Sequence, residues 1–250
     1  MRKYRLIILF VWISVSLFAG SIEDDMKKAA KAIQNKDYTT ALKVYQMLEE
    51  TGYASVGLYQ NMAICQSALQ QEINALVSVE KGLLYKPEDY ELLKIRENIL
   101  KDHPEIDAHL QSSGFIKLWK KFASLLLPTG WSVLSLIVLI VVGMITIKLY
   151  PEWGQNSKLK LFGGILGAIF ILFVITGIYR NHQLYHSNTA IVASKQTLLL
   201  LGPDKQSPIL DTLIAGNKVY KTDHIGQWWN VQTAFGERGW IQSENAVMIR

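Results

Sequence analysis

This chain of 250 residues contains six prolines and a single cysteine, Cys65. One thiol excludes an intramolecular disulfide and any metal cluster built on several cysteines. Cys65 falls in the apolar stretch MAICQSAL, so we expect a small buried core residue, with a redox role as the alternative. The sequence also lacks a P-loop, an HExxH zinc motif and any Ser/His/Asp or Cys/His set. We therefore expect no catalytic residue, no metal, no cofactor and no enzymatic activity.

Charge is missing from two long apolar stretches, residues 131–149 and 161–179. The first has no charged residue before Lys148, and the second has none. About 19 helical residues span ~28 Å, close to the ~30 Å hydrocarbon core of a bilayer. A buried core helix would show a polar stripe, which both stretches lack. We expect two transmembrane helices joined by a short cytoplasmic loop, 150–160. Without an ionisable group at their centres, a transport role has little support.

Net charge is +5, yet the chain lacks a basic cluster on a soluble segment. The segment 21–112 carries fifteen Asp and Glu against ten Lys and Arg. The basic excess lies at the N-terminus and around the apolar stretches. Nucleic-acid binding would need clustered Lys and Arg on one soluble face. We therefore expect no nucleic-acid partner.

The N-terminus has the layout of a secretory signal peptide, which we place at residues 1–20. Arg2, Lys3 and Arg5 precede an apolar stretch from Leu6 to Phe18, and small residues follow. An uncleaved anchor is the alternative. In either case the chain continues outside the cytoplasm and the two spans return it there. Both soluble parts are therefore expected on the non-cytoplasmic side.

The segment 21–112 contains a helical pattern that repeats after 34 residues. The first copy places small and apolar residues at helical spacing, and the second does the same before Pro87; they are Tyr38, Ala41, Tyr45 and Leu48, then Glu72, Ala75, Val79 and Gly82. With Ala63 on the preceding helix, this pattern resembles the tetratricopeptide repeat. YELLKIRENILK, from Tyr90, is a further leading helix or a cap. The resemblance implies a short peptide-binding groove, for which the candidates are Gln60, Asn61, Ile64 and Ser67.

The segments beside the spans are expected to be a juxtamembrane amphipathic stretch, 113–130, and a linker, 180–187. Gly163 and Gly167 are four residues apart, a spacing that lets helix backbones approach closely, here towards Gly143. The alternative is that glycine is simply common in membrane helices. His182 and His186 could share one helix face for a metal, but no third ligand is evident, so a solvated linker is the preferred interpretation.

The final segment, 188–250, alternates short β-rich stretches with the turn signals Gly202-Pro203, Ala215-Gly216 and Phe235-Gly236. The opening AIV, the step Leu213, Gly216 and Val219, the strand WWNV and the turn GERGWI resemble the bacterial SH3 domain. The resemblance implies a small all-β SH3-like barrel that binds peptides through exposed aromatics. The candidates are Tyr220, Trp228 and Trp229. We expect Trp240 and one of the adjacent pair to fill the core.

In this order, the parts form a multidomain membrane protein: an all-α tetratricopeptide-repeat domain, a two-helix transmembrane hairpin and an SH3-like barrel. That architecture resembles the BatE-like family of the bacterial Bat aerotolerance operons. The resemblance implies an inner-membrane scaffold with periplasmic domains, oxidative or envelope stress as context, and Bat proteins with von Willebrand A domains and a MoxR-type ATPase as partners. A cell-wall peptide is a further candidate ligand. The alternatives are a targeting subunit of a cell-wall remodelling system and a membrane stress sensor.

Overall fold

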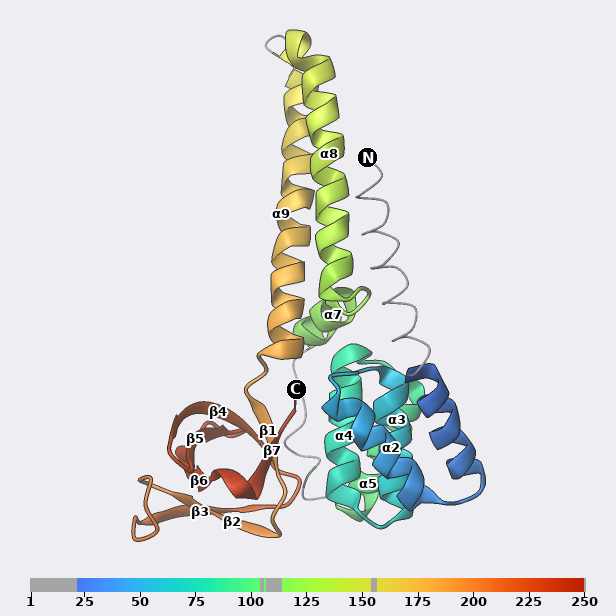
Figure 1. The fold of residues 1–250 in the computed structure, drawn as a ribbon. Helices are drawn as coiled ribbons and strands as arrows, with labels where there is room; N and C mark the ends of the chain where they lie inside the picture. The colour runs from blue at the N-terminus through green and yellow to red at the C-terminus, as the bar shows by residue number, and fades with distance from the viewer. Residues whose placement is uncertain (1–21, 104–105, 107–113, 154–156, 250) are drawn as a thin grey trace, which may run out of the picture.

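The computed structural model describes residues 22–103, 106, 114–153 and 157–249 of the chain. These residues form a group of short helices, two long helices and an antiparallel sheet (Figure 1). The two long helices run side by side, and the helical group and the sheet both lie at the same end of the pair (Figure 1). The predicted signal peptide, residues 1–20, falls outside the described residues.

The helical group repeats with a fixed period. It consists of a helix over residues 22–34, α2 (Tyr38–Glu50), α3 (Val56–Ala68), α4 (Glu72–Tyr85) and α5 (Tyr90–Asp102). Helices α3 and α5 start 34 residues apart, at residues 56 and 90, and so do α2 and α4, at residues 38 and 72. Lys36 and Gln70, also 34 apart, both have a positive φ, 60° and 59°, in the turns that precede α2 and α4. The chain therefore repeats its backbone conformation together with its helix boundaries.

Side chains at the helix starts and contacts explain this arrangement. Asp37, Ser55 and Asp89 each accept a hydrogen bond from a backbone N–H in the first turn of the following helix. Where helices meet closely, the sequence supplies small residues, and Ala63, Ala75 and Gly82 are all buried. A Cβ at Gly82 would lie 2.6 Å from Leu92 Cδ1, so only glycine fits this contact without movement.

The long helices are α8 (Pro128–Trp153) and α9 (Ser157–Tyr185), preceded by the short helix α7 (Gly114–Ala123). Both α8 and α9 contain stretches long and apolar enough to cross a membrane, Pro128–Ile145 and Leu161–Tyr185. Proline suits the first turn of α8, where its missing N–H has no helical partner. Both helices extend into the loop expected at residues 150–160, so that only 154–156 lie between them.

Two expectations for this region are corrected by the structure. Residues 180–185 are not a linker but the end of α9, because Arg180 and Leu184 are buried. The close contact between the long helices lies at Gly177, where a Cβ would stand 3.2 Å from Trp131 Cβ. A Cβ at Gly143 or Gly167 would meet no atom within 4 Å in the described part of the chain. Gly163 is half-buried.

The sheet has seven strands in the order β3-β2-β6-β5-β4-β1-β7. Each strand overlaps one of the β-rich stretches of the sequence: β1 (Thr189–Val192), β2 (Gln196–Leu200), β3 (Ile209–Ile214), β4 (Lys218–Ile225), β5 (Trp228–Thr233), β6 (Arg238–Gln242) and β7 (Ala246–Met248). Every strand contributes to one buried cluster, from Ala190 and Val192 on β1 to Ala246 on β7. The sheet therefore curls around a single core.

The helical group and the sheet share a second buried cluster. Ile191 and Ile249 of the sheet pack with Ala75, Leu76 and Val77 of α4 and with residues of α5, and Ile106 completes the cluster. Ile106 contacts Gly216, which has a φ of +91° and no side chain to obstruct it. Because Ile106, Ile191 and Ile249 are each almost fully buried, the two parts are docked against each other.

Candidate interaction surfaces

A series of contacting aromatic rings lies at the end of the long helices that is nearest to α7, which we call the hairpin base. Trp119 of α7 contacts Tyr179 and Phe122, Phe122 contacts Trp131, and Trp131 contacts Phe173, with ring centroids 5.2 to 6.0 Å apart. The indole N–H of Trp131 donates to the Ala123 carbonyl at 3.0 Å. Tyrosine and tryptophan favour the headgroup layer of a bilayer. The rings thus attach α7 to the hairpin at the depth where a membrane surface would lie.

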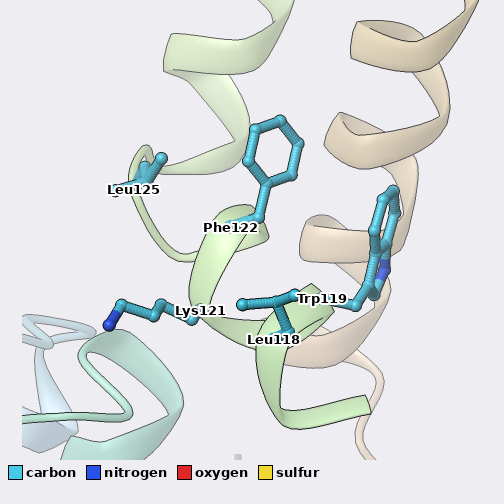
Figure 2. Close-up of a pocket in the computed structure, with 5 residues that line it drawn as sticks. All are labelled: Leu118, Trp119, Lys121, Phe122 and Leu125. Carbon is cyan, nitrogen blue, oxygen red and sulfur yellow. The ribbon is translucent and has the colours of Figure 1, made fainter. Parts of the chain in front are cut away.

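Helix α7 separates its apolar and basic side chains. Leu118, Trp119, Phe122 and Leu125, together with Lys121, line a hollow of about 440 Å³, and Leu118 and Leu125 are two-thirds exposed. Figure 2 shows Phe122 and Trp119 directed towards the long helices, whereas the Lys121 side chain extends away from them. Lys121 pairs with Glu88 of the helical group at 2.7 Å. This distribution is typical of a helix that lies in a membrane interface.

Arg180 fastens the end of α9 to the helical group. Its side chain is fully buried; Nη2 donates to the Tyr85 carbonyl at 2.9 Å, and Nη1 donates to Gln183 Oε1 at 2.8 Å. Tyr85 is the last residue of α4, and a helix C-terminus carries partial negative charge that favours a cation. This hydrogen bond therefore holds the end of α9 against the helical group.

Glu80 of α4 joins the helical group to the sheet. Its carboxylate accepts a hydrogen bond from Lys218 Nζ of β4 at 2.8 Å and lies 3.6 Å from Arg96 of α5. The Glu80 side chain is only 9% exposed, so this is a largely desolvated ion pair. Removing one partner from such a pair leaves an uncompensated charge in a poor solvent. The ion pair thus helps to fix the orientation of the sheet relative to the helical group, next to the apolar cluster that they share.

The groove candidates are partly accessible. Gln60, Asn61 and Ile64 on α3 are half-buried, and Ser67 is exposed. The opposite side of α3 carries buried Tyr59, Met62 and Gln66. Asn61 lies beside the buried Tyr45 hydroxyl, and burial raises the pKa of Tyr45 to about 12. Asn61 therefore supports the core, while Gln60, Ile64 and Ser67 offer a contact surface.

The sheet aromatics divide between two faces. Trp229 packs against the core on the same face as Val231, and Lys221 Nζ lies 4.6 Å from its ring centroid. Strand alternation places Trp228 on the other face. We expected Trp240 to fill the core, and the structure shows that it does not. Its neighbours Gly239 and Ile241 occupy the inward-facing positions of β6, so Trp240 lies on the outer face. Tyr220 is 48% exposed.

A surface that the aromatic pattern did not predict lies on β2 and β3. Strand β3 is an edge of the sheet, and four exposed aliphatic side chains lie on or beside this ribbon, namely Leu198, Leu201, Ile209 and Leu210. Leu199 and Leu200, between the first two, are buried. Residues 198–201 are four consecutive leucines. Because they show no alternation of apolar and polar residues, the sequence alone does not indicate which of them face the core. We call this surface the β3 ribbon.

The described residues contain no group of three or more His, Cys, Asp and Glu side chains placed to hold a metal ion. His182 and His186 stack on the exposed end of α9, with ring centroids 5.8 Å apart. Cys65 is buried, as expected, and burial raises the pKa of its thiol to about 11. At neutral pH this thiol is therefore protonated and shielded.

Comparison with known proteins finds no family model and no curated protein that matches the chain.

Proposed function

We propose that the protein is a non-enzymatic scaffold that holds two protein-binding modules at a membrane surface. The observation that carries this proposal is the docking of the helical group, the sheet and the hairpin base through Ile106, Glu80 and Arg180. Modules fixed to one another present their surfaces at a constant separation. A partner complex that contacts both surfaces gains effective concentration without new contacts.

The two modules are proposed to be a tetratricopeptide-repeat array and an SH3-like barrel. The 34-residue period of helix boundaries and of the positive-φ residues Lys36 and Gln70 supports the first. Seven short strands around one core support the second. The BatE-like assignment, the periplasmic side and the Bat and MoxR-type partners remain proposals that rest on the order of the parts.

The partner is proposed to be a membrane protein that contributes an extended segment to the β3 ribbon. An edge strand presents unpaired backbone N–H and C=O groups to such a segment. Exposed Leu198, Ile209 and Leu210 beside that edge would receive alternate apolar side chains. An exposed apolar patch on a sheet edge promotes aggregation unless another chain covers it. We therefore propose that this patch is a partner-binding surface.

Site-specific photo-crosslinking in intact cells tests this proposal. A photoreactive amino acid at Leu210 should give a discrete adduct with a membrane protein, and one at Ser67 should report on the groove. The same probe at Glu244, exposed and distant from both in the chain, is the control. Leu198→Asp should abolish the adduct at Leu210 and leave the protein folded, because residue 198 is exposed. The same adducts from Leu210 and Glu244 would overturn the proposal.

A further inference from the structure

A cavity of about 280 Å³, with polar and charged side chains among its lining residues, lies where the helical group, α7, the end of α9 and the sheet meet. Its lining comes from five separate stretches of chain. Glu80 belongs to α4, Lys120 to α7, His182 to α9 and Lys218 to β4, and Ile249 follows β7. The cavity is therefore created by the docking itself.

Among the described residues, the charges around this cavity do not balance. The Glu80 carboxylate is already engaged by Lys218 at 2.8 Å and by Arg96 at 3.6 Å. Lys120 is half-buried, and its ammonium forms no hydrogen bond or ion pair with any residue that the structure describes. Burial and the nearby Lys218 ammonium lower the pKa of Lys120, although Glu80 partly offsets them. In the part of the chain that the structure describes, one carboxylate thus faces the three cations Lys120, Lys218 and Arg96.

The neutral groups in the cavity can complete an anion site. Thr189, Tyr179 and Tyr220, which carry hydroxyls, and Asn188, which carries an amide, are among the lining residues. Hydroxyl and amide donors beside lysine are the groups that bind phosphate oxygens in proteins. The exposed imidazole of His182 adds a further donor at the rim.

The position of the cavity indicates the source of the phosphate. Tyr179 lines the cavity and also contacts Trp119, the ring next to Lys120 on the interfacial helix α7. The apolar side of α7 is turned to the hairpin base, and Lys120 reaches the cavity from that same helix. A lipid whose tails lie against α7 would bring its headgroup to this opening.

We propose that the cavity binds the phosphate group of an anionic phospholipid, with Lys120 as its principal cation. This goes beyond the scaffold function and does not depend on it. A bound headgroup would supply the missing negative charge at the junction of the three parts. The lipid would then stabilise the docked arrangement only in a membrane that contains acidic headgroups.

The test uses the full chain in nanodiscs of phosphatidylcholine, alone or mixed with phosphatidylglycerol. After extraction, native mass spectrometry should show phosphatidylglycerol retained in preference to phosphatidylcholine. Lys120→Gln should lower this preference roughly tenfold, the worth of one charge-assisted hydrogen bond. Lys121→Gln is the matched control on the same helix; it is exposed and already paired, so we expect less than about a twofold change.

Two additional measurements separate loss of the binding site from loss of the fold, and lipid binding from binding of free phosphate. Tyr220→Phe removes one hydroxyl from an exposed side chain and should lower phosphatidylglycerol retention by a smaller factor with the fold intact. Titration of the detergent-purified chain with inorganic phosphate, followed by phosphorus NMR, reports on free anions. Equal lipid retention in the two lysine variants would overturn the proposal. Lys120-dependent binding of inorganic phosphate without phosphatidylglycerol retention would overturn the lipid assignment in favour of a soluble phosphate.

Discussion

At the scale of single residues, a few buried polar side chains determine how the parts of this molecule meet. Glu80 and Arg180 each connect segments far apart in the chain, 138 and 95 positions from their partners Lys218 and Tyr85. Neither residue belongs to a motif, and helix periodicity assigns Glu80 only to a helix. Their importance was therefore not predictable from the sequence, because no local pattern records a contact between distant segments.

Asp89 provides a prediction with a defined pH dependence. Burial alone would raise its pKa, but Lys86 and the Leu92 amide outweigh burial and hold the pKa of this carboxyl below its ordinary value. A lowered pKa stabilises the fold at pH above the unfolded value of about 4, and this contribution is lost as pH falls through the folded pKa. Asp89→Ala should cost about 1 kcal/mol at pH 7.

Thermal melts followed by circular dichroism at pH 7 and pH 3 check this expectation. The difference between wild type and Asp89→Ala should shrink at pH 3. Asp37→Ala removes the corresponding cap of α2, which is exposed, and should have a smaller effect. A difference for Asp89→Ala that is the same at both pH values would show that the charge has no part in it.

At the scale of elements, much of the fold was predictable from the sequence. The 34-residue repeat placed α2, α4 and α5, and β-rich stretches between turn signals placed all seven strands. These features are local, since caps, periodicity and turn residues act within a few positions. The end of α9 was predicted wrongly as a linker. Arg180 and His182 give it a polar composition, and Arg180 is buried through a contact with Tyr85, which lies far away in the sequence.

The candidate site was less predictable for the same reason. Tyr220 was identified as an exposed aromatic, and it lines the junction cavity. Lys120 and Glu80 lie in that cavity too, but the sequence shows them only as ordinary charges on amphipathic helices. The location of Trp240 on the outer face depended on the inner positions of Gly239 and Ile241. Strand alternation alone does not say which of its two faces is the inner one.

Gly82 gives a prediction about helix packing. A Cβ at this position would lie 2.6 Å from Leu92 Cδ1 and 3.2 Å from Tyr59 Cβ, and both side chains are buried. Gly82→Ala should therefore lower the free energy of unfolding by roughly 1–2 kcal/mol despite the better helix propensity of alanine. Denaturant unfolding of the helical signal measures it.

The control is Gly57→Ala in α3, where a Cβ would meet nothing within 4 Å among the described residues. This variant should be as stable as wild type or more stable by up to about 1 kcal/mol. If both variants lost the same free energy of unfolding, the close contact with Leu92 would not be the reason that position 82 requires glycine.

At the scale of the whole molecule, docking of the sheet on the helical group can be broken at one position. Gly216 has a φ of +91° and contacts Ile106, so Gly216→Ala adds backbone strain and a clash at the shared cluster. We expect faster hydrogen exchange in α4, α5 and β1, with the sheet core still protected. Gly226→Ala is the control, because Gly226 has a φ of +57° and a Cβ there would meet nothing within 4 Å among the described residues. Matching exchange in both variants would contradict docking at Ile106.

The hairpin geometry predicts the side of the membrane on which each part lies. The helical group and the sheet occupy the same end of α8 and α9 (Figure 1), so a bilayer crossed by both helices leaves them on one side. Lys43→Cys on α2 and Lys205→Cys between β2 and β3, both exposed, should react with a membrane-impermeant maleimide from the same side. Gln155→Cys, between the long helices, should react only from the other.

Because the single native cysteine is buried, it should give no background signal in this labelling experiment. Cys65 has no exposed surface, and burial raises the pKa of its thiol to about 11, so wild-type protein should stay unlabelled at neutral pH. Labelling of wild type in the presence of denaturant confirms that the thiol is intact. If Lys43→Cys and Lys205→Cys react from opposite sides, α8 and α9 do not cross the membrane as a pair. The shared cluster around Ile106 could then not form in the cell, and a scaffold with two fixed surfaces would lose its structural basis.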